Sequence, residues 1–161
     1  MVLDNYITFI ENILKRIHDF GIDVSDLNMD HIGYQASSND DYDNLKAEFN
    51  KIGELVSEKI VGGRRVGIYK LKNQLKYKQY LNEAIELVAP KEGQVCLSGL
   101  EHVEFILKET FDSFMKKYPN ISWDTSKTNQ PMFPMIKLKL SDTTQVKFHY
   151  TPVLEIVKGA L

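Results

Sequence analysis

The chain has 161 residues, of which 43% are hydrophobic and 26% charged, a composition typical of a globular protein long enough to bury a core. Its 20 basic and 22 acidic residues leave a net charge of −2, which argues against a general affinity for nucleic acid or an acidic membrane surface. The single cysteine, Cys96, excludes an intramolecular disulfide, and no apolar run approaches the roughly 20 residues that cross a bilayer. We therefore expect a cytoplasmic protein that binds neither nucleic acid nor a membrane.

Three segments carry apolar side chains at the 3.6-residue spacing of an amphipathic helix. They cover residues 3–20, 39–52 and 109–118. Gly21, Gly53 and Pro119 follow them as helix-ending residues, and Asn39 is the expected cap of the second helix. The apolar stripe of the first helix either packs on its own domain or docks a partner protein, and packing on its own domain is the simpler expectation.

Short segments rich in apolar and β-branched residues predict strands between and after these helices. They cover residues 29–36, 55–61, 65–71, 84–89, 101–107, 121–125, 135–140, 146–150 and 153–157. The pair Gly62–Gly63 and the segment 141–144 predict hairpin turns, and 90–99 predicts a linker.

The predicted elements begin in the same order in the two halves of the chain, with a strand, a helix and then three strands, and the second half adds one more strand at its end. His31 and His102 are separated by nearly the same number of residues as Glu86 and Glu155. The repetition predicts two related βαβββ modules, over 29–93 and 99–161, after a helical extension over 1–28.

Alternation along a strand places the two histidines on the face opposite the apolar residues. Ile32 and Tyr34 share one face and His31 lies on the other, while His102 and Glu104 share a face of the second strand. We expect the apolar faces to receive the helices and the histidines to point away from them.

Glu86 and Glu155 each stand between strongly apolar neighbours on their own face of a predicted strand. Such a carboxylate either meets water at a sheet edge or faces a cavity that holds a charge partner. Two imidazoles and one or two carboxylates converging in a cavity are ligands for a divalent metal. Taken singly, each of these residues is as readily explained as an ordinary core or edge residue, and only their paired recurrence favours a site.

Four motifs carry a resemblance to a known superfamily: DHIGY (30–34), IELVAP (85–90), EHVEF (101–105) and LEIV (154–157). With them the sequence resembles the vicinal oxygen chelate superfamily, which includes glyoxalase I, extradiol dioxygenases and bleomycin-resistance proteins, and within it the YecM-like branch, over residues 1–158. The resemblance implies an α+β fold in which two βαβββ modules form a curled mixed sheet around a cavity. It also implies a divalent ion (Zn, Ni, Mn or Fe) held by His31, His102, Glu155 and Glu86.

The resemblance implies a small-molecule substrate with two neighbouring oxygens and a metal-dependent isomerase, epimerase or lyase reaction. Glu86 or Glu104 would then take the proton, or Glu104 would instead orient a ligating imidazole. A non-catalytic binding module and an Fe(II) extradiol-type dioxygenase are the alternatives, and the oligomeric state, monomer or homodimer, stays open.

Three further residues have two readings each. His149 lies either at the cavity mouth or outside the barrel, and Arg64 and Arg65 either bind an anion or are solvated turn residues.

Overall fold

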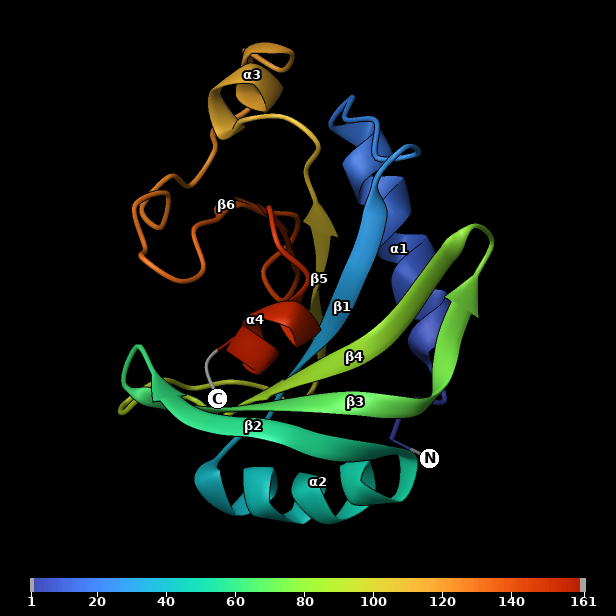
Figure 1. Ribbon diagram of the computed structural model, residues 1–161, viewed down its shortest axis with the longest axis vertical. Helices are drawn as coiled ribbons and strands as arrows, with labels where there is room; N and C mark the ends of the chain where they lie inside the picture. The colour runs from blue at the N-terminus through green and yellow to red at the C-terminus, as the bar shows by residue number, and fades with distance from the viewer. Residues whose placement is uncertain (1, 160–161) are drawn as a thin grey trace.

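The computed structural model describes residues 2–159, which fold around a single curled sheet (Figure 1). Its elements follow one another as α1 (Tyr6–Asp19), β1 (Asn28–Gln35), α2 (Asn39–Ile52), β2 (Gly53–Val61), β3 (Arg64–Tyr77), β4 (Tyr80–Val88), β5 (Gly99–Ile106), α3 (Phe111–Lys116), β6 (Ile136–Lys139), β7 (Gln145–His149) and α4 (Val153–Gly159). Within the described residues, none of these helices has both the length and the apolar character that a membrane span requires.

The helix boundaries follow local chemistry. The α1 helix ends where Gly21 adopts a φ of 77°, a left-handed conformation that glycine reaches without strain. The side chain of Ser38 caps α2 by accepting a hydrogen bond from the Asp41 backbone N–H at 2.9 Å. The expected cap, Asn39, is instead the first residue of the helix. Thr110 caps α3 in the same way as Ser38 caps α2.

The sheet has seven strands in the order β2-β3-β4-β1-β5-β7-β6. At its centre β1 and β5 run antiparallel, while β1 pairs with β4 and β5 pairs with β7 in parallel. The two halves of the chain therefore meet along β1 and β5, and each half places its last strand beside its first. The predicted hairpin turns at Gly62–Gly63 and 141–144 join β2 to β3 and β6 to β7.

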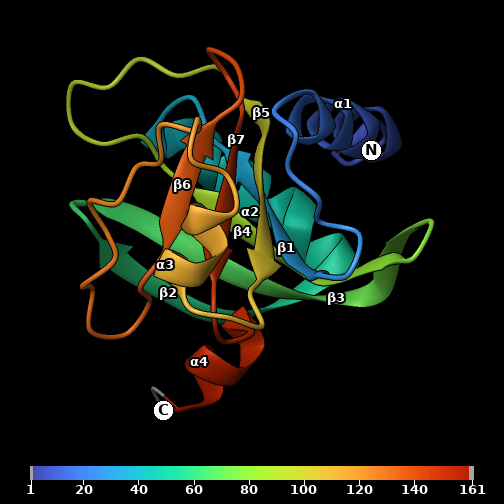
Figure 2. The ribbon, with the colours of Figure 1, turned by 90° about the horizontal axis from the view of Figure 1, so that it is seen from above.

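The convex face of the sheet carries the large apolar clusters. Helix α2 covers β2–β4, and α1 lies on the outside beside β1 and β5 (Figures 1 and 2). Ile10, Ile13 and Ile17 of α1 are fully buried in one cluster with Ile32 of β1 and Phe105 of β5. The apolar stripe of the first helix thus packs on its own domain, as expected. The concave face is left for polar residues and for α4.

Two predicted strands of the second half are wrong. Residues 153–157 form helix α4, because Pro152 with its fixed φ precedes the first helical residue and Glu155 and Lys158 suit the first and last turns. Residues 121–125 contribute only an isolated bridge between Asp124 and Lys137. The α+β architecture with a curled mixed sheet is confirmed, but the second half contains a helix in place of a fourth strand.

Helix α4 lies on the concave side of β2–β4 (Figure 1). Its first residue, Val153, is buried against Ile68 of β3 and Ala84 of β4. The backbone N–H of Val153 donates a hydrogen bond to Asp30 Oδ2 at 3.0 Å, which ties the start of α4 to β1. The C-terminal helix therefore closes one side of the concave face.

Candidate metal centre

The pairing of β1 with β5 brings the two histidines side by side. His31 lies opposite Glu104, and Gly33 lies opposite His102. Because the strands are neighbours and the side chains alternate, His31, His102 and Glu104 all point to the concave face. In β4, Glu86 is in register with Gly33 and joins them.

Four donor groups converge there: His31, Glu86, His102 and Glu104 offer ligand atoms that all lie within 4.8 Å of one another. His31 Nε2 lies 3.5 Å from Glu86 Oε2 and 3.4 Å from Glu104 Oε1. His102 Nε2 lies 3.8 Å from Glu86 Oε1 and 3.3 Å from Glu104 Oε1. All four residues are buried, with Glu86 the most exposed at 8%.

Each histidine is oriented by the acidic residue that precedes it in the sequence. His31 Nδ1–H donates to Asp30 Oδ2 at 2.7 Å, and His102 Nδ1–H donates to Glu101 Oε2. Glu101 is itself held by the Gln145 side chain, which donates to its Oε1 at 2.7 Å. Because a carboxylate only accepts, the proton of each neutral ring lies on Nδ1, and Nε2 presents its lone pair to the cluster.

Lone pairs then face carboxylate oxygens, an arrangement that is unfavourable unless a positive charge lies between them. A proton on Nε2 is one solution. Burial lowers the pKa of His31, but Glu104 and Asp30 outweigh it and hold the pKa well above its usual value. A divalent cation is another solution, and it uses the same lone pairs.

The donor set fits such an ion. His31 Nε2 and both carboxylate oxygens of Glu104 are buried without a hydrogen-bond partner. Two ligands of a tetrahedral ion at about 2.1 Å are about 3.4 Å apart, which matches the separations within this cluster. Imidazole and carboxylate together are the donors that Zn, Ni, Mn and Fe accept.

Gly33 makes room for one of the imidazoles. A Cβ atom at this position would lie 1.9 Å from Cε1 of His102. A larger residue at position 33 would displace the ring, so the glycine in DHIGY serves the geometry of the second half of the chain.

Lys147 is an unexpected member of the cluster. Its Nζ lies 3.3 Å from Glu104 Oε1 and 3.4 Å from His102 Nε2, and the residue is 6% exposed. Burial lowers the pKa of Lys147, but the charges of Glu104 and Glu86 outweigh it and raise the pKa above its usual value. The amine is therefore a buried ammonium.

His149 approaches the cluster from β7. Its Nδ1–H donates to the Thr151 carbonyl at 2.9 Å, so Nε2 offers a lone pair that lies 3.2 Å from Glu104 Oε2 and 3.4 Å from Asp30 Oδ2. The residue is 1% exposed, which places it inside the barrel beside the donor set.

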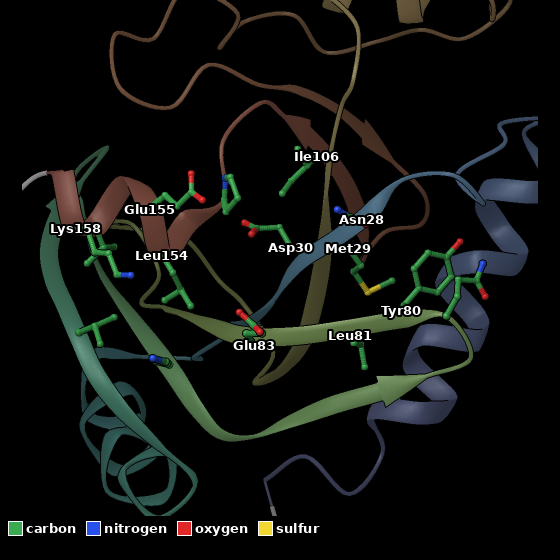
Figure 3. A pocket seen from close by; sticks show the side chains of 15 residues that line it. Asn28, Met29, Asp30, Tyr80, Leu81, Glu83, Ile106, Leu154, Glu155 and Lys158 are labelled. Atoms are coloured by element: carbon green, nitrogen blue, oxygen red, sulfur yellow. The ribbon is translucent and has the colours of Figure 1, made fainter.

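The structure does not bring Glu155 to this point. Glu155 is exposed on α4, where it lines a cleft of about 610 Å³ between α4 and strands β1, β3 and β4 (Figure 3). The cleft reaches Asp30 but is not lined by any of the four donors. Glu155 is therefore outside the candidate centre, and Glu104 supplies the second carboxylate.

The two arginines of the β2–β3 hairpin also lie outside the donor set. Arg65 binds Asp43 at 2.6 Å and covers the ring of Tyr42, so it fastens α2 to the sheet. Arg64 is the first residue of β3.

Sequence reasoning missed three residues of the centre: Asp30, Glu101 and Lys147. The first two had a signal, since an acidic residue precedes the histidine in both halves. Lys147 could be recognised only from the strand register. Glu86 of β4 pairs with Gly33, two residues after His31, and Lys147 of β7 pairs with Glu104, two residues after His102. Lys147, not Glu155, is thus the counterpart of Glu86.

Comparisons with known proteins agree with this fold. Protein YecM of Escherichia coli is 26% identical over 96% of this chain and 88% of its own length. A solved structure described as Structural Genomics, Protein EC4020 matches 99% of this chain and 91% of its own, with a TM-score of 0.80 and 24% identity. A methylmalonyl-CoA epimerase, solved in complex with methylmalonyl-CoA and NH4+, matches 79% of this chain and 96% of its own, with a TM-score of 0.55 and 12% identity.

At these identities the two solved structures establish the fold alone, and they agree with the predicted α+β architecture and its curled mixed sheet. The family comparison goes further, because a model described as YecM protein matches residues 1–158. A match over that length, with a related protein aligned over nearly the whole chain, shows that the chain belongs to the YecM protein family.

Proposed function

We propose that this protein binds one divalent metal ion through His31, His102, Glu86 and Glu104 and acts on a small molecule with two neighbouring oxygens. The observation that carries the proposal is the pair of buried groups His31 Nε2 and Glu104, which lie 3.4 Å apart and have no hydrogen-bond donor between them. When bound, the ion would supply a Lewis acid that polarises an oxygen of the substrate.

The residues around the donor set have separate tasks in this proposal. Asp30 and Glu101 fix the tautomers of the two ligating imidazoles and keep their Nε2 atoms aimed inward. Glu104 lies at the centre of the cluster, fully buried, and its place suits a ligand. Glu86 lies at the more exposed side of the cluster, where it serves as a ligand or as the group that accepts a proton from the substrate.

His149 offers a second proton acceptor. Its Nε2 lone pair is buried and has no hydrogen-bond partner, and Thr151 fixes the orientation of the ring. Among the described residues around the donor set, it supplies an imidazole that the four-donor site does not use. We assign it the task of holding a proton that leaves the substrate, next to Glu104.

The enclosure of the site favours a second candidate function, metal binding without turnover. Structural metal sites have four protein donors and no open position, whereas catalytic sites keep a position for water or substrate. All four donors here are buried, and the cleft beside α4 is not lined by any of them. A binding protein that holds its ion in this way needs no entry path for a substrate.

Metal uptake tests the first part of the proposal. Protein freed of metal by a chelator and titrated with Zn2+, Ni2+, Mn2+ or Fe2+ in a calorimeter should bind one equivalent. The His102→Gln variant should lose that uptake, and His18→Gln, altered on the exposed end of α1, should keep it. Absence of binding of every ion by the unaltered protein would overturn the proposal.

Turnover distinguishes the two candidate functions. The metal-loaded protein is incubated with hemithioacetals, with acyl-CoA epimers such as methylmalonyl-CoA, and with catechols. The proposed enzyme should convert one class, and His149→Gln should slow that conversion while leaving metal uptake unchanged. Tight metal binding with no conversion of any class would favour the binding protein.

A further inference from the structure

We propose that the ammonium of Lys147 is the resident cation of this cluster, and that it competes with a divalent ion for Glu104 and His102. This inference rests on the proposed metal site and concerns the affinity of that site for the ion. The protein would fill its site only above a metal concentration that Lys147 sets.

The contacts of Lys147 place its charge on the atoms that an ion needs. Nζ lies 3.3 Å from Glu104 Oε1 and 3.4 Å from His102 Nε2, and these two acceptors are 3.3 Å from each other. An ion bound to both would lie about 2.1 Å from each of them. The same oxygen and the same lone pair cannot serve the ammonium and the ion equally, and the two positive charges repel at this range.

The ammonium also has little freedom to withdraw. Lys147 lies on β7 and pairs in register with Glu104 of β5, so its backbone is fixed beside the donor set. The residue is 6% exposed, and its neighbour in the cluster, Glu104, is fully buried. A buried charge of this kind stays with its carboxylates because leaving them unpaired is costly.

The pairing of the strands shows that Lys147 occupies an equivalent position to a donor. Glu86 lies on β4 in register with Gly33 of β1, and Lys147 lies on β7 in register with Glu104 of β5. The first half thus places a glycine and a carboxylate where the second half places a carboxylate and a lysine. Each half thus contributes one carboxylate, though at non-equivalent positions, and the second half adds a positive charge beside its own.

The consequence is a partial neutralisation of the two carboxylates without metal. Glu86 and Glu104 bring two negative charges to the centre, and Lys147 returns one positive charge. Replacement of Lys147 by methionine keeps an unbranched apolar side chain that is one atom shorter and removes that charge. The variant should bind a divalent ion more tightly, which is the opposite of what the loss of a ligand or a structural support would produce.

Calorimetric titration with Zn2+ and Mn2+ of the metal-free protein and its variants tests this. Lys147→Met should bind at least about tenfold more tightly than the unaltered protein, since a unit charge a few ångströms from the ion is removed. Lys147→Arg, which keeps the charge, should bind no more tightly than the unaltered protein. Lys139→Met, on an exposed position of the adjacent strand β6, should leave the affinity unchanged.

The melting temperature of the metal-free protein is a readout that needs no activity. It should fall in Lys147→Met, because the carboxylates lose their cation, and saturating Zn2+ should raise it by more than in the unaltered protein. If the unaltered protein binds metal and Lys147→Met binds equally or less tightly, the inference is wrong and the metal site stands. If neither protein binds metal, the proposed function fails and this inference with it.

A measurement on the unaltered protein covers the case in which Lys147→Met does not fold. A buried ammonium exchanges its protons slowly, so Lys147 should give a 1H–15N side-chain signal that exposed lysines lack at neutral pH. Addition of Zn2+, which is diamagnetic, should shift or abolish that signal as the site fills. A signal that stays unchanged while calorimetry records full binding would overturn the proposal.

Discussion

At the scale of single residues, the geometry of the centre depends on the residues next to the ligands. Gly33 leaves the space that the His102 ring occupies, and Glu101 holds that ring from its other nitrogen. The imidazole is therefore clamped between a strand backbone and a carboxylate. Its Nε2 has one orientation available, toward Glu104.

Substitution of Gly33 by alanine should disrupt the centre. The new methyl group would lie 1.9 Å from His102 Cε1, so the ring or the strand must move. We expect a loss of about 1–3 kcal/mol in the free energy of unfolding, measured with denaturant, together with weaker metal binding by calorimetry. Gly159→Ala is the matched control, since a Cβ there meets nothing within 4 Å. Equal stability and equal affinity in both variants would contradict this account.

At the scale of elements, the buried side of helix α1 packs into the same core that supports the strands of the metal centre. Ile10, Ile13 and Ile17 pack in one cluster with Ile32 and Phe105. Ile32 follows His31, and Phe105 follows Glu104, on the opposite face of the same strands. The helix thus supports the strands that carry the ligands from behind.

The two faces of α1 should respond differently to truncation. Ile13→Ala removes a side chain that is 1% exposed and should cost about 2–4 kcal/mol in the free energy of unfolding. Ile7→Ala, on the same helix but 38% exposed, should cost less than about 1 kcal/mol. Denaturant unfolding of both variants measures the difference. Similar losses in the two would mean that α1 is not held by its buried stripe.

At the scale of the whole molecule, the four donors come from three strands and both halves of the chain. His31 and Glu86 belong to the first half, and His102 and Glu104 to the second. The donors meet only when β1 and β5 pair, so binding of an ion and association of the halves stabilise each other. Ligand binding to the folded state alone then adds to stability by mass action.

Metal should therefore raise the melting temperature of the entire protein, and a chelator should reverse the rise. An ion at one hundred times its dissociation constant adds about 2.7 kcal/mol to the free energy of unfolding. His102→Gln should abolish the metal-induced rise, measured as the difference between melting curves with and without Zn2+. His18→Gln should keep it. A rise that persists in His102→Gln would place the ion elsewhere.

Much of this arrangement follows from patterns that span only a few residues. The helical spacing of α1 and α2, the alternation that turns His31 and His102 from the apolar face, and the repetition of the two halves are all visible in the chain. These features depend on backbone periodicity, which neighbouring residues set among themselves. The fold and both imidazoles were accordingly predictable.

The carboxylate that the second half contributes to the donor set was not predictable in this way. The run VLEIV fits a short strand as well as a helix, and packing of Val153 against β3 and β4 together with the Asp30 bond favours the helix. The same packing turns Glu155 outward. The choice of Glu104, and the placement of Lys147 beside it, follow from the pairing of β5 with β1 and β7. Register between strands is set by burial across the whole sheet, and a shift of one residue reverses every side chain, so no local pattern contains it.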